Sequence, residues 1–136
     1  MSATIKHINI NNVDIPVIFE EQKSLPILNL QLIFKNSGYI KDNQNLGLAS
    51  LSARVLNEGT KKLGSVKFSE VLDDNAITIH SAVGFETLTI ELSSLKEKST
   101  LAMKSLDELF SKFIKKYIRK SKNFGYWKFK KKRERL

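Results

Sequence analysis

The chain of 136 residues contains no cysteine, which excludes disulfide bonds and thiolate metal ligands. No stretch approaches the ~20 consecutive apolar residues that a membrane-spanning helix needs. The first residues lack a basic segment followed by an apolar one, so they do not have the pattern of a signal peptide. We therefore expect a cytoplasmic protein.

Histidine is also scarce, and nucleotide-binding motifs are missing. The two histidines, His7 and His80, lie far apart and have no neighbouring ligand or triad pattern. His80 falls in an alternating segment, where we expect it at the core edge or on the surface. The chain has neither a P-loop nor a dinucleotide-binding glycine pattern. These absences argue against a histidine-based metal cluster and against the nucleotide-binding classes.

The positive charge is concentrated at one end of the chain. The formal net charge is +9, yet residues 112–136 hold 12 of the 23 Lys and Arg and one of the 14 acidic residues. Residues 1–111 are therefore close to neutral, with a net charge of −2. We expect one α+β domain over residues 1–111 and a basic, aromatic-rich tail over residues 112–136.

The hydrophobic pattern predicts the order β-β-β-α-α-β-β-α. Alternating segments predict strands at residues 5–10, 15–21 and 27–35, and a hairpin formed by residues 76–83 and 86–92 around Gly84. Helical spacing predicts one helix beginning near Gly47, a second over residues 66–73 capped by Ser65, and a third from about Ser94. Such an order is typical of an antiparallel-rich sheet with helices packed on one face.

Residues 47–60 carry the most informative pattern. At about 100° per residue, one side of this helix holds Leu48, Leu51, Ser52 and Val55, and the opposite side holds Ser50, Ala53 and Arg54. We expect the first side to pack on the sheet and the second to face solvent or a partner. Gly59 lies where a helix favours a left-handed residue at its C-terminus.

This helix resembles the zinc-motif helix of the pitrilysin, insulinase and mitochondrial-processing-peptidase family of inverzincin metallopeptidases. The likeness rests on Gly38, Gly47-Leu48-Ala49, Asn57-Glu58-Gly59-Thr60 and the turn near residues 72–76, and it covers residues 5–112. It implies the early part of a processing-peptidase-like α+β domain, so that the domain in this chain is incomplete.

The resemblance also implies which residues stand at the catalytic positions. In the family, two histidines hold zinc and a glutamate is the general base. Ser50, Ala53 and Arg54 occupy these positions here, and they offer a weak ligand, no base and a permanent cation. The third ligand falls in the basic tail, where Glu134 is the only carboxylate. We therefore expect no catalytic residue, no cofactor and no metal ligand.

The resemblance implies a non-catalytic, truncated subunit that supports peptide binding or an active partner with an intact zinc motif. In a sharper version, Arg54 binds a carboxylate of the partner or peptide. A second hypothesis is a small binding module whose tail contacts nucleic acid or an anionic membrane. A third is an active peptidase despite the altered motif. We also consider that residues from about 112 onward are disordered, or are read in a shifted frame.

Overall fold

The computed structural model describes residues 3–43 and 45–117 and confirms the predicted α+β class. Its strands and helices follow the predicted order: β1 (Thr4–Ile10), β2 (Val13–Phe19), β3 (Ile27–Lys35), α1 (Leu48–Asn57), α2 (Gly64–Asp74), β4 (Thr78–Val83), β5 (Thr87–Leu95) and α3 (Ser99–Tyr117). Two short 3₁₀ turns precede α1 and α3, η1 (Tyr39–Lys41) and η2 (Lys96–Lys98). None of the helices in this part of the chain is long and apolar enough to cross a membrane.

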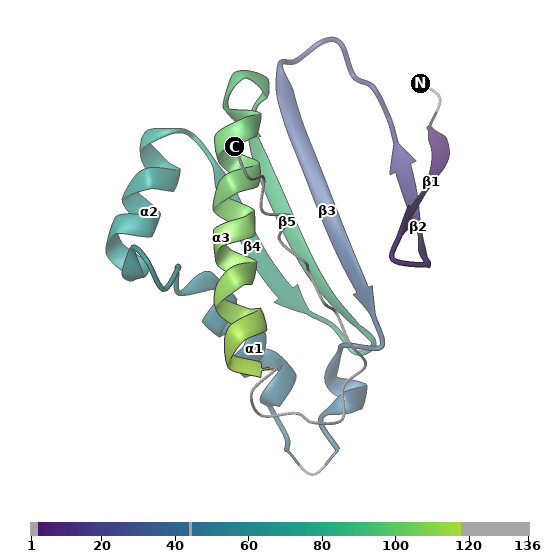
Figure 1. Cartoon of the computed structure of the whole chain (residues 1–136), viewed down its shortest axis with the longest axis vertical. Coiled ribbons are helices and arrows are strands. Elements are labelled where there is room, and N and C mark those ends of the chain that lie inside the picture. Colours follow the sequence, from purple (N-terminus) through teal and green to yellow (C-terminus); the bar gives the residue numbers. More distant parts are fainter. Residues whose placement is uncertain (1–2, 44, 118–136) are drawn as a thin grey trace, which may run out of the picture.

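The main sheet has three antiparallel strands in the order β3-β5-β4 (Figure 1). Its central strand β5 turns alternate residues inward, so Ile90 and Leu92 are almost completely buried. All three helices contribute to the core that covers this face, which consists of Leu56, Phe68, Ile77, Ile90, Leu92, Ala102, Leu106 and Leu109. The sheet is therefore covered by helices on one face, as the sequence pattern predicted.

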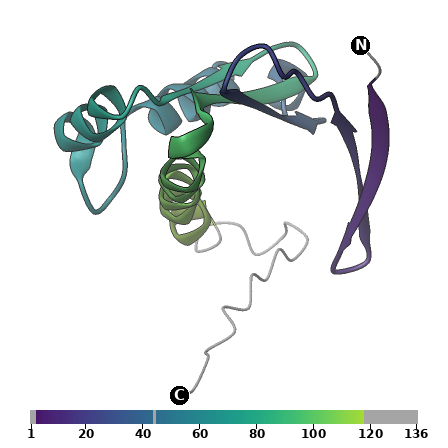
Figure 2. The same cartoon turned by 90° about the horizontal axis from the view of Figure 1, so that it is seen from above.

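The hairpin of β1 and β2 forms a separate sheet beside β3 (Figures 1 and 2). Asn11 and Asn12 connect its strands, and both have positive φ, the combination of a two-residue type I′ turn. Ile10 and Val13 pair across this turn, and hydrogen-bonded pairs alternate with non-bonded pairs from there along the hairpin. Pro16 belongs to a non-bonded pair, so its backbone faces away from β1. Because proline has no N–H, β2 offers an incomplete edge, which helps to explain why the two sheets are not joined.

Two predicted helix starts are wrong. The strand pairing of β5 continues to Leu95 opposite Ile27, and the next N–H, of Lys96, still donates to the Pro26 carbonyl oxygen at 2.8 Å. The third helix therefore begins at Ser99 rather than near Ser94. The second helix begins at Gly64, and no side chain caps it, so Ser65 is not its N-cap.

The turn before η1 lies against the β4–β5 turn without intervening side chains. The N–H groups of Tyr39 and Ile40 donate to the carbonyl oxygens of Gly84 and Phe85, at 3.0 and 2.9 Å. A Cβ atom at Gly38 would overlap these same two carbonyl groups. Glycine at residue 38 therefore allows the close backbone contact that anchors the segment leading into α1.

We predict that Gly38→Ala lowers the free energy of unfolding by about 1–3 kcal/mol, because the new methyl group overlaps backbone atoms that cannot turn away. Urea denaturation followed by circular dichroism measures this change. Gly84→Ala is the matched control, since its nearest described neighbour would be Thr87 Oγ1 at 3.6 Å, an ordinary contact. Equal stability of the two variants would contradict the assigned role of Gly38.

Candidate functional site

The helix α1 is held at its N-terminus by a buried carboxylate. Asp42 accepts hydrogen bonds from the backbone N–H groups of Gly47, at 2.9 Å, and of Ala49, at 2.8 Å. These are two of the N–H groups that a helix start leaves without partners inside the helix. Gly47 itself has a φ of 87°, a left-handed conformation that favours glycine. The start and direction of α1 are therefore set by Asp42.

The face of α1 that packs on the sheet is not the predicted one. Ala53 is 5% exposed and Leu56 is 2% exposed, whereas Leu51, expected in the core, is 57% exposed. Leu48 and Val55 are also exposed. The small side chain of Ala53 lets the helix approach β4 closely at this point, while Leu56 enters the core. The other large apolar residues of α1 form an outer stripe of Leu48, Leu51 and Val55.

Two polar side chains join α1 to the outer edge of β4. The Ser81 Oγ donates to the Ala53 carbonyl oxygen at 2.7 Å. The Asn57 Oδ1 accepts from the Ser81 backbone N–H at 2.9 Å, and the Asn57 Nδ2 donates to the Ser81 carbonyl oxygen at 3.2 Å. Asn57 therefore bonds to β4 at this point as a neighbouring strand would, and it closes that edge locally.

The three motif positions have three different environments. Ser50 is half-buried, Ala53 is buried against β4, and Arg54 is exposed and forms no ion pair with any described residue. The prediction that all three share a solvent-facing side is therefore wrong for Ala53. Within residues 3–43 and 45–117, no group of three histidine, cysteine or acidic side chains is placed to hold a metal ion.

The two histidines lie in different sheets, and both are exposed. In the hairpin, the His7 Nδ1 lies 2.7 Å from the Asp14 Oδ2. His80 lies on the face of the main sheet that the helices leave open, opposite Glu91 on β5. Glu91 also accepts a hydrogen bond at 2.9 Å from Gln31 on β3. The row formed by Gln31, Glu91 and His80 crosses three strands, and no local sequence signal indicated it.

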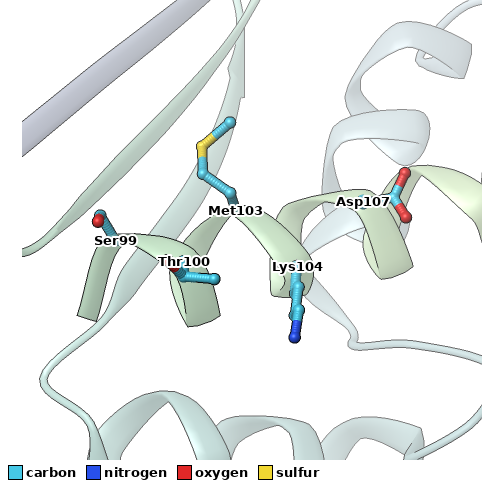
Figure 3. A pocket seen from close by; sticks show the side chains of 5 residues that line it. All are labelled: Ser99, Thr100, Met103, Lys104 and Asp107. Atoms are coloured by element: carbon cyan, nitrogen blue, oxygen red, sulfur yellow. The ribbon is translucent and has the colours of Figure 1, made fainter. Parts of the chain in front are cut away.

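One hollow on the described surface is formed by a single helix. It has a volume of about 460 Å³ and is lined by residues of α3 alone: Ser99, Thr100, Met103, Lys104 and Asp107 (Figure 3). Met103 and Lys104 point in different directions from the helix, so the polar groups do not converge on one point. This hollow does not have the arrangement of a catalytic site.

The predicted tail lies almost wholly outside the described residues. The boundary expected at residue 112 falls within α3, which continues to Tyr117. Glu134, the basic and aromatic residues beyond position 117, and the shifted-frame hypothesis all concern residues that the structure does not describe. Binding of nucleic acid or anionic lipid through the tail stays a prediction from the sequence.

No protein-family model matches the chain, but one curated relative does. The chain is 42% identical over 108 residues to a protein named "Non-peptidase homolog YmxG" from Helicobacter pylori. This match covers 79% of the chain and 25% of the relative. The chain therefore spans about a quarter of the length of the curated relative that it matches.

Two solved structures share the fold. One is described as a peptidase M16 inactive domain from Pseudomonas fluorescens, with a TM-score of 0.65 and 20% identity over 82% of this chain and 26% of that one. The other is described as a protease from Helicobacter pylori, with a TM-score of 0.64 and 9% identity over 79% of this chain and 26% of that one. The chain thus has an M16 peptidase-like fold, in agreement with the metallopeptidase resemblance of its sequence.

We predict that Asn57→Ala lowers the free energy of unfolding by about 1–3 kcal/mol, because it leaves the N–H and carbonyl groups of Ser81 without these partners. Urea denaturation measures the loss. Asn9→Ala is the control, since Asn9 is exposed on the hairpin. The control is expected to change stability by no more than about 0.5 kcal/mol. A loss no larger than that of the control would show that Asn57 does not fasten α1.

We also predict that Ala53→Glu, which introduces the carboxylate that the sequence resemblance implies for an active peptidase, destabilises the protein by at least about 3 kcal/mol, because it buries a charge without a partner. Thermal and urea unfolding check this result. Arg54→Glu places the same side chain at the adjacent exposed position, where a change of at most about 1 kcal/mol is expected. If both variants unfold alike, Ala53 is not packed against β4 as described.

Proposed function

We propose that this chain is a non-catalytic M16-like module that supports peptide binding or an active partner instead of cleaving peptides itself. The observation that carries the proposal is its 42% identity, over 108 residues, to a protein named a non-peptidase homolog. The fold that the chain shares with an M16 inactive domain also supports a non-catalytic role. The chain spans about a quarter of each, so its role within a larger assembly is part of the proposal.

The chemistry of α1 supports the absence of catalysis. We infer that Ser50, Ala53 and Arg54 stand where an active relative has two zinc ligands and a general base. A serine hydroxyl is a weak zinc ligand, alanine has no titratable group, and arginine repels a cation. The burial of Ala53 adds a steric reason, because the side chain at this position has no room to reach a bound water molecule.

Two exposed surfaces suit a binding role. The outer stripe of α1 (Leu48, Leu51 and Val55) presents large apolar side chains, the kind of surface that protein partners cover. Arg54 is exposed beside it and, without an ion pair to any described residue, is available for a carboxylate of the partner. We propose that a related subunit with an intact His-x-x-Glu-His motif docks on this stripe.

The open face of the main sheet is the second surface and the one that we propose to contact peptide. Its exposed or half-exposed polar side chains include Asn29, Gln31, Thr78, His80, Thr89, Glu91 and Ser93, and the same face also holds the exposed apolar residues Ile27, Ile33 and Leu95. The polar groups hydrogen-bond to varied peptide backbones without selecting one side chain strongly. This face therefore fits a supporting role in substrate binding.

The isolated chain is expected to hold no stoichiometric zinc and to cleave no peptide above background, as measured by elemental analysis and a fluorogenic peptide assay. Purified after co-expression with an M16 subunit that has the intact motif, the tagged chain is expected to retain that subunit. Leu51→Asp should weaken this retention by about tenfold or more, because it places a charge in an apolar interface.

Val66→Asp is the matched control, since Val66 is an exposed apolar residue on α2, outside the outer stripe. It should retain the subunit as the unmodified chain does. Stoichiometric zinc with activity in the isolated chain would overturn the non-catalytic assignment. Equal retention by the two variants would overturn the docking role of the stripe.

A further inference from the structure

The outer edge of β3 has backbone groups without described partners. The Lys96 N–H donates to the carbonyl oxygen of Pro26, so the backbone of residue 26 faces β5. In an antiparallel pair every second residue has the same orientation, so the N–H and C=O groups of the even-numbered β3 residues also point toward β5. Odd-numbered residues, from Ile27 to Lys35, turn theirs outward. Among the described residues, only the Lys35 carbonyl oxygen has a partner, the Ser37 Oγ at 3.2 Å.

Two of the other strand edges, those of β4 and β2, carry protection that β3 lacks. Asn57 occupies the edge of β4 at Ser81, and Pro16 interrupts the edge of β2. The nine residues of β3 include no proline, and their single charged residue, Lys35, stands at the end. A long edge strand without proline or central charge is ready to pair with another strand.

The helix-side face of β3 is also incompletely covered. Leu28, Leu30 and Leu32 are only partly buried, and Phe34 is 40% exposed although it contacts the ring of Phe110. On β5, the residues opposite Leu28, Leu30 and Leu32 are almost fully buried, whereas Leu88, opposite Phe34, is partly buried. A strand added beside β3 would therefore gain both backbone hydrogen bonds and apolar contacts on this face.

We propose that two copies of this chain pair antiparallel through β3, with Gln31 on the twofold axis. This register is the one that uses all nine residues and places outward-facing odd residues opposite one another, as a ladder requires. It sets Leu28 opposite Phe34 of the second copy and Leu30 opposite Leu32. Lys35 lies opposite Ile27, so the two lysines are at opposite ends, whereas parallel pairing in register would place them side by side.

The hairpin stands next to this edge and is not bonded to it. No described backbone hydrogen bond joins β1 or β2 to β3, and residues 20–25 that connect them are all exposed. Figures 1 and 2 show the hairpin as a separate arm on the β3 side of the sheet. Pairing therefore requires this arm to turn away from the β3 edge about the exposed residues 20–25.

Single cysteines test the register directly, because the chain has none of its own. Opposite residues in a hydrogen-bonded antiparallel pair have Cα atoms about 5.5 Å apart, within the range that a disulfide spans. Gln31→Cys is therefore expected to form a covalent dimer under mild oxidation. Asn29→Cys is the control on the same face of the same strand, where the two cysteines would lie about 14 Å apart.

Non-reducing mass analysis is expected to show about tenfold more dimer for Gln31→Cys than for Asn29→Cys, since only the former satisfies disulfide geometry. Equal yields from the two variants, or no dimer from either, would overturn the proposed register. Sedimentation of the unmodified chain from micromolar to millimolar concentration is expected to show a rise toward twice the monomer mass. A constant monomer mass would overturn the pairing itself and would leave the proposed function untouched.

A second pair of variants separates edge pairing from loss of a side chain. Gln31→Pro and Gln31→Ala both remove the hydrogen bond to Glu91, but only proline removes the outward N–H. Proline is expected to raise the dimer dissociation constant by about tenfold or more, and alanine by less than about threefold. Equal effects of the two substitutions would contradict pairing through the backbone.

Discussion

The contact between the end of α1 and the outer edge of β4 determines much of this structure. Asn57 and Ser81 exchange backbone and side-chain hydrogen bonds, and the Ser81 hydroxyl also reaches the carbonyl oxygen of Ala53. These bonds require the helix axis to lie close to the strand, so only small side chains fit between them. The same contact buries Ala53, closes the β4 edge at one position and leaves Leu48, Leu51 and Val55 on the outer side of α1.

The exposed surfaces of β3 and of the open sheet face follow from the fact that helices cover the main sheet on one face. The helices bury most of β5 on their side, including Ile90 and Leu92, but β3 lies at the border of the helix layer and stays half covered. Its outer edge and the opposite face of the sheet have no described cover. A small domain with so much accessible strand surface has more ways to bind another chain than to enclose a small molecule, which agrees with the lack of a convergent pocket.

The sequence predicted the order and approximate bounds of the strands and helices because each alternates or repeats strongly over its own length. The prediction from sequence failed where contacts between residues far apart in the chain determine the packing. Hydrophobic periodicity favoured Leu48, Leu51 and Val55 as the inner face of α1, yet the close approach to β4 selects the smaller face around Ala53. The bond partners Asn57 and Ser81 stand 24 residues apart, and no local pattern indicated that they pair. The third helix was expected too early because the apolar residue Leu95 fits both a helical stripe and the end of β5.

The proposed lack of catalysis and the packing of α1 concern the same position. By the sequence resemblance, Ala53 stands where an active peptidase has an ionised glutamate, and that group must reach a water molecule on a metal ion. Here the same position lies against β4, under the hydrogen bond from Ser81 to the helix carbonyl. A glutamate would have to displace the helix or lose its hydration, and both cost free energy. We therefore expect that a glutamate at this position does not by itself create a peptidase site, because α1 would also have to move away from β4 and Asn57 would have to give up its bonds to Ser81.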